Sequence, residues 1–343
     1  MKKGGPKRLV VALDLGGTKL AGALLDRSGK ILRRMSVSVD GASAMAPVRQ
    51  MVEIARALAR DNENRKLKIG NRAHGKKRAK MQLEKPEIAA VGVAVPGLVR
   101  RGGTVWAPNL KGWTKMPLAR RLRGELGVPV MVESDRNAAV LGETWRGAAR
   151  GKNDVIVLMI GTGIGAGILS GGRLVRGAHE LSGCMGWMTE REEYGEDAAR
   201  VGQLESLAAG PGIARAAERE LSRGVESLLR EIPTEARTAQ EVAASARRGD
   251  MLSIEVFLEA GRLLGYGVAN LVSLFDPEMV VIGGGLARAS DLYLDALKKA
   301  MKERAQPISG KNVRLAMSRL GGDANLLGAA RVAWEQTRKK RGR

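Results

Sequence analysis

Cysteine, histidine and aromatic residues are scarce in this chain of 343 residues. It has one cysteine, Cys184, and two histidines, so a disulfide within the chain is impossible and a zinc site of cysteines and histidines is not expected. Aromatic residues make up 3%, and no apolar run approaches the roughly 20 residues that a membrane helix needs. We therefore expect a globular protein without a membrane partner. Because no export segment is recognisable, we expect it to be cytoplasmic.

Acidic residues are few relative to basic ones, since 58 Lys and Arg face 36 Asp and Glu and the net charge is +22. Much of the excess lies in the two tails and in a segment at about 60–85, where ten basic residues accompany three acidic ones without an apolar period. Nucleic-acid binding favours such charge on a folded face beside aromatic residues, and 60–85 contains none. We interpret this segment as a solvated basic insert, and nucleic acid is not an expected partner.

The pattern of apolar residues predicts two α/β domains, at 1–150 and 151–343. In the first, strands are predicted over 8–15, 20–26, 31–39, 88–95 and 128–132, with helices after Ser43 and over 137–148. A second series begins near 154 and includes a helix over 252–275, a strand over 279–282 and a final strand and helix. Residues 16–24 and 161–169 share four identities, and each segment follows an apolar strand. This parallel predicts a duplicated fold with a cleft between the domains.

Three glycine-rich segments are candidates for phosphate binding. In the first, Gly16 and Gly17 follow Asp14 in a turn, for which a tight hairpin is an equally good interpretation. In the second, alternate glycines from Gly161 to Gly167 leave one face of a strand without side chains, beside which a polyphosphate could lie. The third, Gly283–Gly285, ends a buried strand and is either a ligand loop or a helix entry.

Two such loops facing each other across a cleft predict binding of a nucleoside triphosphate. Transfer of its phosphoryl group requires a metal ion that neutralises charge and a base for the accepting group. Asp14 lies at a strand end and is the candidate to hold Mg²⁺ through water, with turn capping as the alternative. Asp135 follows another strand and is the candidate base, with a helix N-cap as the alternative.

Six motifs taken together resemble the repressor, open reading frame and kinase (ROK) family. They are DLGGTK at 14–19, VGVAVPGLV at 91–99, APNLKGW at 107–113, ESDRNAAVLGE at 133–143, GTGIGAGI at 161–168 and VVIGGGL at 280–286. Members are bacterial sugar kinases and related transcription regulators on the actin-like sugar-kinase fold, a duplicated ribonuclease H-like α/β architecture. The resemblance spans nearly the whole chain and implies ATP, Mg²⁺, a sugar acceptor and a dimer or tetramer.

The resemblance also implies a role for each matching residue. The γ-phosphate and the metal would be met by Asp14, Gly16, Gly17, Thr18 and Lys19, and the other phosphates by Gly161, Thr162, Gly163 and Gly165. Adenosine would lie at Gly283, Gly284 and Gly285. Asn109 and Asp135 would hold the sugar, with Asp135 taking the proton from the accepting hydroxyl.

The chain departs from the family pattern at the acceptor site. Where the family reads AGExGH, this chain has Cys184 in place of the Glu and Trp187 in place of the His, and Ser134 replaces an Asn. The family's zinc-binding CxCGxxGCxE aligns with 196–205, which retains Glu205 but no cysteine, so zinc is predicted to be absent. The predicted acceptor site consists of Asn109, Ser134, Asp135, Cys184, Trp187 and Glu205.

These departures lead to a functional prediction. A buried sugar hydroxyl left without its partner costs about 1 to 3 kcal/mol, so glucose is expected to bind poorly. Trp187 could stack on a sugar face, and Trp106 and Trp113 flank the Asn109 motif, although core packing explains these two equally well. We predict an ATP-dependent kinase for a less usual sugar or a glycoside.

One alternative is a non-catalytic regulator that senses a sugar or a nucleotide. Regulators of the family usually carry an N-terminal helix-turn-helix, for which the first predicted strand, beginning near residue 8, leaves no room. Another alternative is ATP hydrolysis coupled to a conformational change, but the retained acceptor residues favour a kinase.

Overall fold

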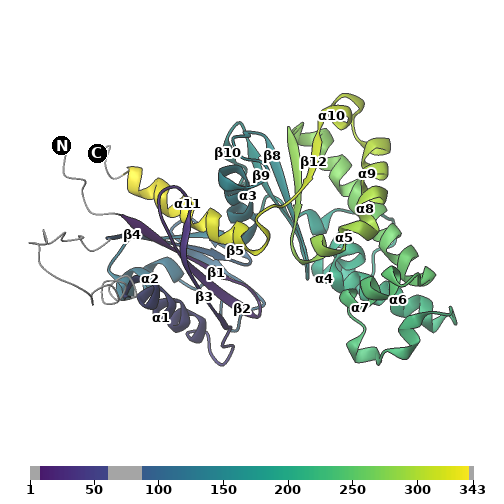
Figure 1. Ribbon diagram of the computed structural model, residues 1–343, viewed down its shortest axis with the longest axis horizontal. Coiled ribbons are helices and arrows are strands. Elements are labelled where there is room, and N and C mark those ends of the chain that lie inside the picture. Colours follow the sequence, from purple (N-terminus) through teal and green to yellow (C-terminus); the bar gives the residue numbers. More distant parts are fainter. Residues whose placement is uncertain (1–7, 61–86, 340–343) are drawn as a thin grey trace, which may run out of the picture. The chain divides into compact units, whose positions relative to one another are not determined.

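The computed structural model describes residues 8–60 and 87–339 (Figure 1). The chain divides into two compact units, which we call unit 1 (Met1–Arg146 with Asp323–Arg343) and unit 2 (Gly147–Gly322). The predicted basic insert lies outside the described residues, apart from Arg60. Within the described ranges, no helix combines the length and the apolar composition that crossing a bilayer requires.

Unit 1 is built on a sheet of strand order β3-β2-β1-β4-β7. Its strands are β1 (Leu9–Leu15), β2 (Lys19–Leu25), β3 (Ile31–Ser38), β4 (Ile88–Val95) and β7 (Val130–Ser134), beside a hairpin of β5 (Leu98–Arg100) and β6 (Thr104–Trp106). Its helices are α1 (Ala46–Arg60), α2 (Leu118–Leu126), α3 (Asp135–Arg146) and α11 (Ala324–Lys339). The first three strands form an antiparallel meander, whereas β4 and β7 run parallel to β1.

Helices cover both faces of this sheet, which explains why β1 and β4 are continuous apolar runs. The predicted apolar face of α1, including Met51 and Leu58, packs with alternate residues of β1 such as Leu13. On the other face, α11 packs against β1, β4 and α3 (Figure 1).

The position of α11 differs from the predicted boundary, which placed 151–343 in a single domain. A Cβ added to Gly92 of β4 would collide with the carbonyl of Ala329, and one added to Gly328 would collide with the carbonyl of Ala138 in α3. Small residues therefore let α11 approach the backbones of unit 1 closely. The apolar periodicity of α11 predicts a helix, but it does not say which sheet that helix covers.

Unit 2 repeats the arrangement, with strand order β10-β9-β8-β11-β12 and the same strand directions. Its strands are β8 (Val155–Ile160), β9 (Ile164–Ser170), β10 (Arg173–Leu174), β11 (Met279–Gly283) and β12 (Arg314–Met317). Its helices are α4 (Glu196–Val201), α5 (Gln203–Ala208), α6 (Gly210–Ser222), α7 (Ala239–Arg247), α8 (Met251–Phe275), α9 (Ser290–Arg304) and α10 (Pro307–Asn312). The predicted duplicated α/β architecture is thereby confirmed.

The core of unit 2 forms where the sheet meets its helical layer. Apolar residues of β8 and β11, such as Ile156 and Ile282, pack with the buried face of α8. Asp250 caps α8 by accepting a hydrogen bond from the N–H of Ser253 at 3.0 Å. The chain thus places the ends of β8 and β11, which carry two of the predicted glycine loops, beside a rigid helical layer.

Candidate functional site

Unit 1 holds two carboxylates at one edge of its sheet. Because β1, β4 and β7 are parallel, their carboxyl ends lie at the same edge, with Asp14 near the end of β1 and Asp135 directly after β7. Burial raises the pKa of Asp14 to about 7, and the charge of Asp135 adds to this increase. The hydrogen bond from Asn325 and the charge of Lys19 act in the opposite direction. The two carboxylates therefore interact electrostatically.

Asn325, in the first turn of α11, contacts Asp14. Its Nδ2 donates a hydrogen bond to Asp14 Oδ1 at 3.2 Å, while its buried Oδ1 has no hydrogen-bond donor within the described part of the chain. Carboxylate and amide oxygens suit a hard cation such as Mg²⁺, so this pair fits a hydrated ion. Among the residues described, no group of three or more Asp, Glu, His or Cys side chains is arranged to hold a metal directly. Asn325 could not be predicted from the sequence, because no local pattern connects it to Asp14.

Asp135 is the first residue of α3, and its neighbours fix the start of that helix. Glu133 Oε1 accepts hydrogen bonds from the Ser134 N–H at 3.0 Å and from Asn137 Nδ2 at 2.9 Å, and all three of these residues are buried. Asp135 Oδ1 accepts the N–H of Arg136 at 2.8 Å. Burial raises the pKa of Asp135, and the charge of Arg136 partly offsets that increase. The result is a rigidly placed carboxylate with enhanced basicity.

The turn between β1 and β2 is the predicted first glycine loop. The Gly16 N–H donates to the Lys19 carbonyl at 2.9 Å, so the segment forms the tight hairpin that the sequence analysis considered. A Cβ added to Gly17 would meet no atom within 4 Å, and the φ of Gly17 is not in the left-handed region. Neither packing within unit 1 nor backbone conformation requires glycine at position 17. Close approach of a ligand to the backbone is a reason for glycine that remains.

Asn109 and the two tryptophans near it have different environments. Asn109 is exposed in the turn that follows β6. Trp113 is only 1% exposed and donates its Nε1–H to the carbonyl of Ala44 at 2.9 Å, so it belongs to the core. Trp106 is 43% exposed. Of these two tryptophans, Trp106 alone has an accessible surface for a ligand.

In unit 2, the second and third glycine loops come together. Gly161, Thr162 and Gly285 line one cavity of about 590 Å³, and a Cβ on Gly161 would lie 3.6 Å from the Gly285 nitrogen. Gly284 has φ +87°, and a Cβ there would collide with the backbone of Ile160, so this position requires glycine. The structure thereby joins two segments that are more than 100 residues apart in the sequence.

The rest of this cavity has a composition that suits a nucleoside. Small or apolar residues form much of the wall, and arginine, threonine and glutamine side chains form the remainder. The lining residues beyond the glycine loops include Gly210, Pro211, Ala214, Arg237, Thr238, Ala239, Gln240, Ala243, Arg247, Leu286, Arg288 and Ala289. Its volume lies within the range of small-molecule sites. The part of the wall contributed by α6 and α7 could not be predicted from the sequence, because these helices carry no glycine motif.

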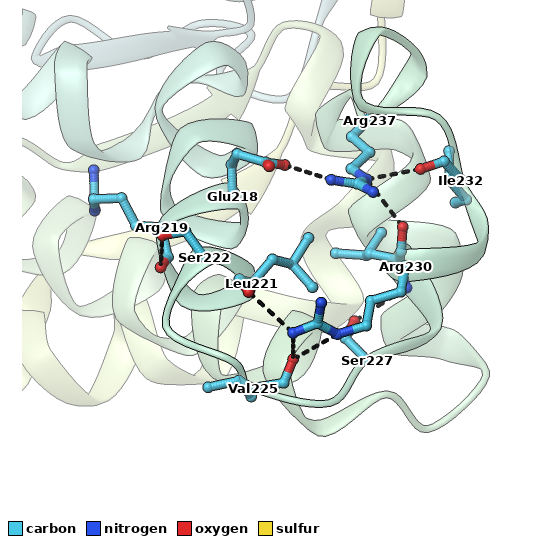
Figure 2. Close-up of polar contacts among 10 residues, drawn as sticks. Glu218, Arg219, Leu221, Ser222, Val225, Ser227, Arg230, Ile232 and Arg237 are labelled. Atoms are coloured by element: carbon cyan, nitrogen blue, oxygen red, sulfur yellow. Dashed lines mark hydrogen bonds and ion pairs between the residues drawn. The ribbon is translucent and has the colours of Figure 1, made fainter.

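Two arginines fix the connection between α6 and α7 beside this cavity (Figure 2). Arg237, one of the lining residues, donates its Nε–H to the carbonyl of Ile232 at 2.8 Å and its Nη1–H to Glu218 Oε2 at 2.8 Å. Arg230 donates through Nη2 to the carbonyls of Leu221 and Val225, at 3.0 and 2.9 Å. One wall of the cavity is therefore held by a network of side chains and backbone carbonyls.

Unit 2 also carries the other predicted acceptor residues. Glu205, on α5, accepts the Ile164 N–H at 2.7 Å through Oε2, and a Cβ on Gly163 would lie 2.8 Å from the same oxygen. Burial raises the pKa of Glu205, and the Ile164 hydrogen bond counteracts it. Cys184 is partly buried, and Trp187 is 53% exposed in the short 3-10 helix η2 (Met185–Trp187). Glu205 thus lies directly beside the second glycine loop.

The predicted site residues are divided between the units. Unit 1 contains Asp14, Gly16, Gly17, Thr18, Lys19, Asn109, Ser134 and Asp135. Unit 2 contains Gly161, Thr162, Gly163, Gly165, Cys184, Trp187, Glu205, Gly283, Gly284 and Gly285. In unit 1, Asp14 and Asp135 lie at one edge of the sheet, and in unit 2, Glu205 contacts the second glycine loop.

Comparison with known proteins assigns the family. The sequence profile of the ROK family matches residues 74–336. A glucokinase of Halalkalibacterium halodurans is 30% identical over 335 residues, which cover 96% of each protein. A xylose repressor of Caldicellulosiruptor bescii is 31% identical over 247 residues, which cover 70% of this chain and 61% of the repressor.

A solved structure shares the fold. The crystal structure of a ROK family glucokinase from Streptomyces griseus, in complex with glucose and AMPPNP, superimposes with a TM-score of 0.75. That enzyme is 29% identical, and the match covers 95% of this chain and 99% of the glucokinase. The doubled α/β architecture is accordingly the actin-like fold of ROK sugar kinases. By its sequence profile, its relatives and its fold, the chain belongs to the ROK family.

Proposed function

We propose that this protein is an ATP-dependent carbohydrate kinase, which transfers the γ-phosphoryl group of ATP to a hydroxyl of a sugar or sugar-like acceptor. The observation that carries the proposal is the pair of interacting carboxylates, Asp14 and Asp135, at the carboxyl edge of the unit 1 sheet. Its similarity to a glucokinase over 96% of the chain, and to a ROK glucokinase structure that holds glucose and AMPPNP, supports this activity.

In the proposed reaction, Asp135 is the general base. Its carboxylate accepts the proton of the acceptor hydroxyl, while the hydroxyl oxygen forms a bond to the γ-phosphorus. The bond from that phosphorus to the β–γ bridging oxygen breaks, and its electron pair leaves with ADP. The hydrogen bonds around Glu133 hold the start of α3, so the base is positioned before substrates bind.

The remaining polar groups are proposed to bind the nucleotide and the metal. Asp14 and Asn325 would hold a hydrated Mg²⁺, which when bound neutralises phosphate charge. The cavity at Gly161 and Gly285 would accept the adenosine and the adjoining phosphates, because its glycines carry no side chains that would keep a ligand away from the backbone. The Gly16–Lys19 turn of unit 1 is proposed to approach the γ-phosphate.

The acceptor is proposed to be a less usual sugar or a glycoside. Cys184 offers no strong acceptor for a sugar hydroxyl, whereas the exposed indole of Trp187 offers a flat apolar surface for a sugar ring. We therefore expect glucose to be a weak substrate. Rapid glucose phosphorylation with a KM in the ordinary micromolar to millimolar range would contradict this part of the proposal.

The decisive experiment measures ADP release from Mg·ATP across sugars, amino sugars, deoxy sugars, glycosides and cyclitols. One class of compound should stimulate release, and Asp135→Asn should lower kcat by about 10² to 10⁴-fold because the amide cannot accept the proton. Asp295→Asn is the matched control, since Asp295 is 98% exposed on α9 and should leave the rate unchanged.

If Asp135→Asn retains the wild-type rate with the active compound, Asp135 is not the base. If ATP binds but no compound stimulates ADP release, the kinase assignment fails and a sensor becomes the better assignment. The similarity to a xylose repressor supports that second candidate. Salt-dependent DNA binding that is lost on deleting residues 64–82 would establish it.

A further inference from the structure

We propose that Gln203 is a positioning residue for the acceptor side of the site, because its side-chain amide ties residues 190–193 to the segment that carries Glu205. The proposal deepens the proposed function and rests on it. Gln203 does not line the cavity at Gly161, so its effect should be selective for the acceptor.

The amide of Gln203 is fully engaged. The residue begins α5 and is 2% exposed. Its Oε1 accepts the N–H groups of Glu190 and Arg191 at 2.5 and 2.7 Å, and its Nε2 donates to the carbonyls of Arg191 and Glu193 at 2.8 and 2.5 Å. Both amide protons and both lone pairs of the oxygen are thereby used, a pattern that neither a carboxylate nor an apolar side chain reproduces.

The residues next to Gln203 hold the same loop. Gly202 has φ +96°, and a Cβ there would collide with the carbonyl of Gly186 and lie 2.7 Å from the Trp187 Cα. The Leu204 N–H donates to the carbonyl of Met188 at 3.2 Å. Gly202, Gln203 and Leu204 therefore hold the segment that carries Cys184 and Trp187 against the start of α5.

This fastening extends to Glu205. A Cβ on Gly186 would lie 2.9 Å from Glu205 Cβ and 3.0 Å from Glu205 Oε2, so the loop and the carboxylate are in direct contact. Glu205 is itself held by the Ile164 N–H. Releasing residues 190–193 would therefore disturb Trp187 and Glu205 together, while Gly161 keeps its hydrogen bonds with Gly163 and Gly210 beside the nucleotide cavity.

The test compares Gln203→Leu with wild type and with a matched control. Gln306→Leu is that control, because Gln306 Oε1 also accepts two backbone N–H groups, from Ile308 and Ser309, but in α10. Gln203→Leu should raise the KM of the acceptor about tenfold or more and leave the KM of ATP within about twofold. Gln306→Leu should leave both values unchanged.

Amide hydrogen exchange gives a readout that does not require activity. The amides of Glu190 and Arg191 should exchange at least about tenfold faster in Gln203→Leu, because their acceptor is removed. In Gln203→Glu these two amides should exchange at an intermediate rate, because the carboxylate keeps both bonds in which the side chain accepts and loses both bonds in which it donates. If Gln203→Leu does not fold, Gln203→Glu replaces it, and the criterion is then exchange at Glu190 and Arg191 that is faster than in wild type.

Two results would overturn the proposal: unchanged exchange at 190–191, or equal changes in the KM of acceptor and ATP. If no compound is phosphorylated, the proposed function fails, and binding of the sugar panel to both variants, measured by calorimetry beside the exchange rates, still decides the role of Gln203. Treatment with a zinc chelator should leave the exchange rates of the wild-type loop unchanged. Faster exchange after chelation would show that a metal holds this loop, in contradiction to the proposal and to the predicted absence of zinc.

Discussion

Asp14 shows how one residue can connect ligand binding to stability. Its carboxyl has a pKa of about 7 because burial opposes its charge, whereas the unfolded chain has a value near 3.8. Between these two values the folded state binds more protons than the unfolded state, so the free energy of unfolding falls as the pH rises. A bound cation would favour the ionised form and offset this loss.

We therefore expect Asp14→Asn to be more stable than wild type at pH 8 and equally stable near pH 4. The full pKa difference corresponds to several kcal/mol, which partial exposure of the side chain reduces to about 2 kcal/mol. Thermal and urea unfolding of the metal-free protein at the two pH values measures this. A gain of the same size at both values would assign the effect to packing instead of ionisation.

At the residue scale, the sequence predicts those candidate site residues that belong to local motifs. The apolar runs predict Asp14 at the end of one strand and Asp135 directly after another, and the structure has both residues in these positions. Asn325 and Gln203 could not be predicted, because their roles come from partners that tertiary contacts bring near. Trp113 had two equally good interpretations until its burial identified it as a core residue.

Among the elements, α11 depends most on close packing of small side chains. A methyl group added at Gly328 would force the Ala138 carbonyl of α3 to move. Overpacking of this kind lowers the free energy of unfolding by about 1 to 3 kcal/mol. We expect Gly328→Ala to lower the melting temperature by several degrees.

Gly124→Ala in α2 is the matched control for this prediction. A Cβ there would meet no atom within 4 Å, so the substitution should stabilise the helix by up to about 1 kcal/mol. Differential scanning calorimetry of both variants tests the pair. Similar shifts for the two glycines would show that helix propensity, and not the contact with α3, determines the outcome.

The predicted elements differ from the observed ones mainly at their boundaries. The strand predicted at 88–95 is observed as Ile88–Val95, since an apolar run between a charged segment and Pro96-Gly97 has clear limits. The strand predicted at 128–132 is Val130–Ser134, and the following helix begins at Asp135 instead of 137. In that region the polar residues Glu133, Ser134 and Asn137 are buried and form hydrogen bonds with one another. A hydropathy pattern does not predict that polar residues are buried, so it does not give these two boundaries.

On the scale of the whole molecule, unit 1 is discontinuous in sequence. The chain leaves it after Arg146 and returns at Asp323. Deleting residues 323–343 should therefore expose one face of β1 and β4 and abolish hydrogen-exchange protection there, while β8 and β11 of unit 2 remain protected.

Exchange measured by mass spectrometry on the truncated and full chains tests this prediction. Protection that persists in β1 and β4 would show that unit 1 folds without α11. Loss of protection in both units would show that the two do not behave as separate cooperative units.

The same connectivity has a consequence for synthesis. A ribosome completes β1, β4 and α3 of unit 1 long before α11 emerges, whereas all of unit 2 is made without interruption between them. The nascent chain must therefore leave the face of β4 at Gly92 uncovered while about 180 further residues are added, at roughly 5 to 20 residues per second. Unit 2 can finish folding during this interval. Unit 1, although its first residues are made before those of unit 2, is therefore the last to complete its fold.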